Sequence, residues 1–166
     1  LRHGRRVWGA GFFQDDWTFL ARAAGILPAP EISARPLSLD LYWRVVGATL
    51  GYEPKVYTLT RCLLHVASGF LVVRLTRLLH ASVATVLLAG ALYLLSPLAF
   101  EALYWASGVT DLLANCGLLL ALVGMLRGGR PGIILLIVGG LVNLASKETG
   151  WGLPLTDRPG WISSIS

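Results

Sequence analysis

Four long apolar stretches, each close to the length that crosses a lipid bilayer, constrain this 166-residue chain most. They run over about 56–75, 81–100, 109–126 and 131–145. A hydrocarbon core of about 30 Å takes about 20 helical residues, so the last two stretches are on the short side. Because lipid offers the backbone no hydrogen-bond partner, and no alternating barrel pattern is visible, we expect all four to be helices. The sequence therefore predicts an all-α, polytopic transmembrane helical bundle.

Composition agrees with a membrane protein. Hydrophobic residues make up 55% of the chain and charged residues 14%, whereas soluble domains carry about 25% charged residues. A net charge of +5 raises nucleic acid as a partner, but the basic residues are scattered and no nucleic-acid motif accompanies them. We expect no nucleic acid. The two cysteines, Cys62 and Cys116, lie in apolar stretches and are interpreted as packing residues.

The chain divides into three parts. Residues 1–55 are mixed and polar, and we expect an outer loop there with two short interfacial helices, over about 16–25 and 38–50. Ser38 suits the N-cap of the second and Gly51 its end. Residues 56–155 hold the four transmembrane helices, and 156–166 form a truncated tail. Both ends look cut, so we expect a fragment of a longer protein, inactive alone.

The connections between the apolar stretches differ in charge. The first holds Arg74, Arg77 and His80, the third holds Arg127 and Arg130, and the second, about 101–110, has no Lys or Arg. Short basic loops stay cytoplasmic. We therefore expect the first and third connections inside, and residues 1–55, the second connection and the end of the fourth helix outside.

This orientation brings charged residues near membrane depth to one face, where they indicate a site. They are Asp15, Asp16, Glu101, Asp111, Lys147 and Glu148. Each also has a structural interpretation: the aspartate pair as helix caps, Glu101 as an interfacial charge beside aromatic residues, Asp111 as a cap of the third helix, and Lys147–Glu148 as an ion pair. Within the first span, Arg61 is expected to snorkel outward and His65 to be a packing residue.

Several short motifs follow one another along the chain. They are Phe13-Gln14-Asp15-Asp16, Arg35-Pro36-Leu37-Ser38, Ser96-Pro97 with Glu101-Ala102-Leu103-Tyr104-Trp105-Ala106-Ser107-Gly108, Asp111-Leu112-Leu113, and Ser146-Lys147-Glu148-Thr149 before Leu153-Pro154. In this order they resemble the GT-C membrane glycosyltransferases, most closely the protein O-mannosyltransferase-like branch. One position departs: relatives often carry Arg between the Gly and Asp of the second-loop motif, where this chain has Val109.

The resemblance implies an enzyme that moves a sugar from a polyprenyl-phosphate carrier to an acceptor at the outer membrane face. In that family an acidic residue of the first outer loop acts at the acceptor, as general base or through a bound metal ion. This role is carried over to Asp16, with Asp15 as its neighbour; the two would hold a divalent cation if one is needed. Arg35, Arg61 and Lys147 are candidates to stabilise the leaving phosphate, and Glu101, Asp111 and Glu148 to line the site. We expect Asp16→Asn in the intact protein to abolish transfer.

Two other functions stay open. A transporter or flippase for a lipid-linked sugar or a small anion would use Arg61, His65 and Glu101 as an intramembrane pathway, although no inverted repeat or pair of broken helices is visible. A non-catalytic assembly partner would tolerate amides at the acidic positions. The expected partners are a lipid-linked sugar donor and membrane lipids; the sugar and the acceptor are open. A composition rich in Ala, Arg, Gly and Leu favours a bacterial plasma membrane.

Overall fold

The computed structural model describes residues 11–28, 33 and 35–147, and over these residues it contains helices and no strand. Three short helices come first, α2 (Asp15–Ala23), the π-helix η1 (Pro36–Leu41) and α3 (Tyr42–Leu50). The longer helices are α4 (Pro54–Leu78), α5 (Val83–Leu95), α7 (Val109–Arg127) and α8 (Gly129–Ser146). Between α5 and α7 lie η2 (Pro97–Ala99), α6 (Phe100–Tyr104) and η3 (Ala106–Gly108). The predicted all-α fold is confirmed.

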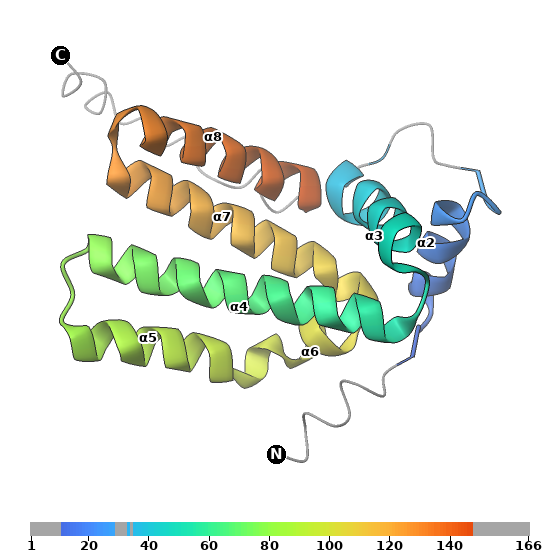
Figure 1. The fold of residues 1–166 in the computed structure, drawn as a ribbon, viewed down its shortest axis with the longest axis horizontal. Helices are drawn as coiled ribbons and strands as arrows, with labels where there is room; N and C mark the ends of the chain where they lie inside the picture. The colour runs from blue at the N-terminus through green and yellow to red at the C-terminus, as the bar shows by residue number, and fades with distance from the viewer. Residues whose placement is uncertain (1–10, 29–32, 34, 148–166) are drawn as a thin grey trace.

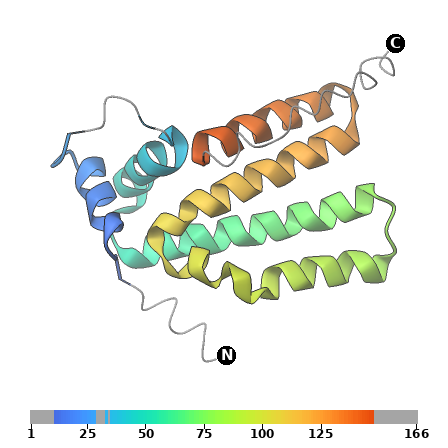
Figure 2. The same ribbon diagram turned by 180° about the vertical axis from the view of Figure 1, so that it is seen from behind.

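Four helical segments are long and apolar enough to cross a membrane. They are Pro54–Leu78, Val83–Tyr104, Ala106–Arg127 and Gly129–Ser146. These bounds agree closely with the predicted spans, and their length and composition make the chain an integral membrane protein. Figure 1 and Figure 2 show the spans side by side in one row, in the order α5, α4, α7, α8. A single row leaves large apolar side chains such as Leu87, Leu92 and Ile137 exposed, as suits contact with lipid.

The second span is not the continuous helix predicted over 81–100. It breaks at Ser96-Pro97, between α5 and η2, because the ring of Pro97 removes a backbone N–H that a continuous helix would use. His65 on α4 lies against this break, where its Nε2 donates to the carbonyl of Leu94 at 3.2 Å. In lipid an unpaired carbonyl is costly, so His65 stabilises the end of α5.

The helices α7 and α8 approach each other backbone to backbone. A Cβ placed on Gly139 would lie 2.4 Å from the backbone nitrogen of Ala121 and 2.5 Å from the carbonyl oxygen of Gly117. Near the other end of the pair, a Cβ on Gly124 would lie 2.6 Å from the carbonyl oxygen of Gly132. Small residues permit this close contact in membrane helices, where dispersion rather than water exclusion drives association.

The short helices before α4 gather at one end of the row, together with α6, η3 and the last turn of α8 (Figure 1). An aromatic cluster holds them to α4: the fully buried rings of Trp43 and Tyr57 lie 4.8 Å apart, and Phe12 lies 5.4 Å from Tyr57. The basic α4–α5 and α7–α8 connections lie at the opposite end of the row. The described parts of the segments predicted to be outside thus meet at one end of the bundle.

The second short helical segment begins earlier than predicted, at Pro36, and Ser38 is not its N-cap. Ser38 lies inside η1, fully buried, and its hydroxyl donates to the carbonyl of Ser146 at 2.6 Å. The N-cap interpretation was wrong because the partner of this hydroxyl is 108 residues away, beyond any local pattern. Gly51 ends α3 as predicted, with a left-handed φ of 89° that favours glycine.

Candidate functional site

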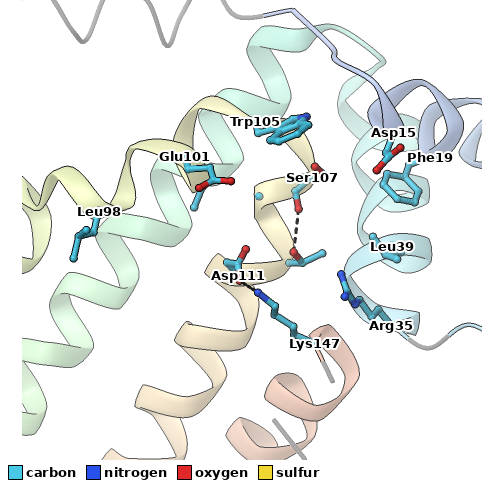
Figure 3. A pocket seen from close by; sticks show the side chains of 13 residues that line it. Asp15, Phe19, Arg35, Leu39, Leu98, Glu101, Trp105, Ser107, Asp111 and Lys147 are labelled. Atoms are coloured by element: carbon cyan, nitrogen blue, oxygen red, sulfur yellow. Dashed lines mark hydrogen bonds and ion pairs between the residues drawn. The ribbon is translucent and has the colours of Figure 1, made fainter. Parts of the chain in front are cut away.

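A cavity of about 580 Å³ lies at the end of the bundle where the short helices gather (Figure 3). Its charged lining residues are Asp15, Arg35, Glu101, Asp111 and Lys147. Figure 3 shows the residues of α2 and η1 on one side and those of α6 and α7 on the other, with Lys147 reaching toward Asp111. The structure thus gathers five of the eight predicted site residues around one cavity. Of the others, Asp16 and Arg61 do not line it, and Glu148 lies outside the described residues.

Opposite charges meet on the floor of the cavity. Lys147 Nζ, just after α8, donates to Asp111 Oδ1 in the first turn of α7. Asp111 therefore pairs with a side chain that follows α8, and the structural interpretation in which it caps α7 is not what the structure shows. The Lys147 side chain remains 29% exposed and that of Asp111 53%, so both are accessible to a ligand that enters the cavity.

The two neighbouring aspartates of α2 face different surroundings. Asp15 is exposed and lines the cavity. Asp16 is fully buried: its Oδ2 accepts the backbone N–H of Phe13 at 3.0 Å, and its Oδ1 accepts that of Ser107 at 2.9 Å. Neither oxygen of Asp16 is therefore aimed at the cavity, and the two carboxylates do not converge on one point.

Burial raises the pKa of the Asp16 carboxyl above its ordinary value, because removal from water disfavours the charged form. The N–H groups of Phe13 and Ser107 and the positive charge of Arg61 act in the opposite direction. The local structure thus supplies Asp16 with donors and a counter-charge that stabilise its ionised form.

Arg61 is buried, and the prediction that it snorkels outward was wrong. Only 2% of the residue is exposed. Its Nε donates to the carbonyl of Leu103 at 3.3 Å and its Nη2 to Thr58 Oγ1 at 3.1 Å. These acceptors, together with the charge of Asp16, replace part of the hydration that Arg61 loses inside the bundle. The pathway of a transporter would need Arg61, His65 and Glu101 together, whereas His65 binds the α5 carbonyl and Glu101 faces the cavity.

The turn from α6 to α7 forms one wall of the cavity. Trp105, Ser107 and Gly108 line it, and a Cβ on Gly108 would lie 2.6 Å from the Cα and carbonyl oxygen of Ala102. Glycine is thus required for the close approach of this turn to α6. Val109, the position at which the second-loop motif departs from the resemblance noted above, is fully buried and does not line the cavity.

Apolar side chains that the sequence interpretation left out also line the cavity, among them Phe19 and Leu39. Phe19 follows Asp15 by four residues on α2, and Leu39 follows Arg35 by four along η1. Residues four apart share a helix face. The signal that could have identified both was therefore this spacing from a charged site residue.

The possible divalent cation at Asp15 and Asp16 gains no support from the geometry. Among residues 11–28, 33 and 35–147, no group of three or more His, Cys, Asp or Glu side chains is placed to hold a metal ion. The two aspartates face different surroundings, as described above.

Comparison with known proteins gives a partial match. The chain is 35% identical over 130 residues to the Protein O-mannosyl-transferase Tmtc2 of Drosophila melanogaster, an alignment that covers 76% of this chain and 13% of the fly protein. The chain is therefore similar to one segment of the fly protein, which is named as a mannosyltransferase. This supports a glycosyltransferase-like membrane protein, although the chain spans about an eighth of its relative's length. No family model matches the chain, and no solved structure does. Because the relative comes from an animal, the bacterial plasma membrane stays a prediction.

Proposed function

We propose that this chain forms the reaction cavity of a glycosyltransferase, which moves a sugar from a polyprenyl-phosphate carrier to an acceptor hydroxyl at the outer membrane face. The observation that carries the proposal is the convergence of three carboxylates and two cations, from five segments of the chain, on one cavity at the end of a transmembrane bundle. The similarity to a named mannosyltransferase makes mannose the first sugar to test.

Within this proposal Asp15 is the general base. Its carboxylate is exposed in the cavity, whereas that of Asp16 is bound to two backbone N–H groups. Asp15 accepts the proton of the acceptor hydroxyl while the hydroxyl oxygen forms a bond to the anomeric carbon. The bond from that carbon to the phosphate oxygen breaks, and the phosphate leaves with the bonding electrons.

Arg35 and Lys147 supply positive charge for the leaving phosphate. Both line the same cavity, and Asp111 holds Lys147 there through their ion pair. The phosphate gains negative charge as its bond to the sugar breaks, so cations placed beforehand stabilise the transition state more than the bound donor. Asp111 keeps the lysine in position when no phosphate is bound.

The test is a transfer assay on the full-length protein reconstituted in lipid vesicles. Polyprenyl-phosphate-linked mannose with a labelled sugar is supplied with a peptide or glycan acceptor, and covalent product is measured. Labelled acceptor is the result expected. If labelled sugar crosses the vesicle membrane and no covalent product forms, the glycosyltransferase proposal is wrong and the transporter function is favoured. No transfer and no transport, with cellular function intact after amide replacement of the cavity carboxylates, would favour the assembly partner.

Replacing Lys147 with methionine should lower kcat/KM for the donor by about 10- to 100-fold, because a charge-assisted hydrogen bond to the phosphate contributes about 1.5–3 kcal/mol. The matched control is Lys55→Met, which removes an exposed lysine from the first turn of α4, outside the cavity. Steady-state kinetics with varied donor measure both. Equal kcat/KM values in the two variants would contradict a role for Lys147 at the phosphate.

A further inference from the structure

Two buried charges hold the two ends of the wall segment 103–107, which carries the cavity-lining residues Trp105 and Ser107. We propose that Asp16 and Arg61 form a buried clamp on this segment, and that Asp16 is a positioning residue for the cavity wall and for Asp15. The effect on transfer rests on the proposed function. The clamp itself does not.

Asp16 ties α2 to the wall. Its Oδ1 accepts the N–H of Ser107, 91 residues later in the chain, while its Oδ2 accepts the N–H of Phe13 just before α2. The same carboxylate therefore fixes the start of α2 and the η3 turn relative to each other. Asp15, the preceding residue on α2, is held at the cavity by this contact.

Arg61 ties α4 to the other end of the same segment. Its Nε donates to the carbonyl of Leu103, the next-to-last residue of α6, and its Nη2 donates to Thr58 within α4. Trp105, midway between the two anchor points, is half-buried and lines the cavity. The wall is thus held from α2 on one side and from α4 on the other.

Charge couples the two halves of the clamp. Both side chains are almost fully removed from water, with exposed fractions of 0% for Asp16 and 2% for Arg61, and each acts electrostatically on the other. Removing one of two buried charges that attract each other leaves the other less compensated, whereas removing both does not. The two residues should therefore be non-additive when they are replaced together.

Hydrogen–deuterium exchange of the full-length protein in detergent tests the clamp without any assay of activity. In Asp16→Ala, the Ser107 N–H loses its acceptor, so we expect peptides over 103–108 to exchange about tenfold faster. Peptides from α7 over 112–124 should be unchanged. The matched control is Asp15→Ala, which removes the adjacent, exposed carboxylate and should leave 103–108 unchanged. Exchange over 103–108 at the wild-type rate in Asp16→Ala would overturn the clamp.

A second variant is used if Asp16→Ala also increases exchange in the α7 peptides over 112–124. The double variant Asp16→Ala with Arg61→Leu removes both buried charges, and we expect α7 protection to return while 103–108 stays fast. If the double variant also restores protection over 103–108, the clamp is refuted. It is likewise refuted if the increase in exchange rate in the double variant equals the sum of the increases in Asp16→Ala and Arg61→Leu.

Transfer kinetics separate positioning from a merely structural role. We expect Asp16→Ala to lower kcat about 100-fold, because a displacement of about 1 Å at the reacting groups has that effect. The donor KM should change less than about threefold, since Arg35 and Lys147 are untouched. A raised KM with normal kcat would overturn the positioning role. Failure of Asp15 replacement to affect transfer would count against the proposed function and leave the exchange result standing.

Discussion

Replacing Asp15 with asparagine is expected to reduce sugar transfer by the full-length protein by about 10²- to 10⁴-fold, the range that a positioned general base contributes. Asparagine matches aspartate in shape but has no basic oxygen to accept the proton of the acceptor hydroxyl. Because Asp15 is exposed, the substitution should leave the fold and the expression level unchanged. The measurement is the initial rate of product formation at matched amounts of folded protein.

Glu101→Gln is the matched control for this prediction. Glu101 is the cavity carboxylate on α6, also exposed, and its replacement changes the cavity charge by the same amount. A loss confined to Asp15→Asn supports Asp15 as the base. A loss confined to Glu101→Gln would move the base to α6, and full activity in both variants would remove the carboxylate mechanism altogether.

Alanine at Gly139 is expected to destabilise the bundle by about 1–3 kcal/mol, the cost of adding a methyl group to a closely packed contact. The added Cβ would meet backbone atoms of α7 at 2.4 and 2.5 Å, and backbone cannot rotate away as a side chain can. The two helices must separate, which also moves Lys147 at the end of α8. The midpoint of thermal unfolding in detergent, followed by circular dichroism, measures the effect.

Gly140, the next residue, is the control for Gly139. Nothing lies within 4 Å of a Cβ placed there, so Gly140→Ala adds no clash and gains about 0.5–1 kcal/mol of helix propensity. The two single-methyl changes should therefore shift the unfolding midpoint in opposite directions. A midpoint that rises in both variants would mean that α7 and α8 are not in backbone contact.

The spans could be predicted from the sequence because lipid leaves the backbone few options, so length and hydropathy alone indicate a helix. The break at Pro97 inside 81–100 was missed, although proline signals it, because apolar composition continues through the break. The fate of His65 was harder to predict, since its partner is a carbonyl on another helix. Local patterns predict elements, and contacts between elements depend on tertiary structure.

Four of the five charged residues of the cavity could be identified because charges near membrane depth are rare, whereas Arg35 was proposed only through the family resemblance. What the sequence could not distinguish was which of two adjacent aspartates faces the cavity. Asp16 is turned away from the cavity because its carboxylate accepts the N–H of Ser107, which lies 91 residues later in the chain. Nor did the sequence indicate the acceptor for Arg61, which was predicted to reach outward. Its Nε instead donates to the carbonyl of Leu103 on α6. Buried polar partners decide these orientations.

Two long-range hydrogen bonds at the cavity end also set an order of events during synthesis. The partner of Asp16, the Ser107 N–H, is synthesised 91 residues later, and the partner of Ser38, the Ser146 carbonyl, 108 residues later. At about 5–20 residues per second, each side chain spends on the order of ten seconds without its final acceptor or donor while later spans enter the membrane. The short helices, which are made before the spans that follow them, are therefore among the last segments to reach their native arrangement. A nascent chain that stops before α8 leaves them without the Ser146 carbonyl.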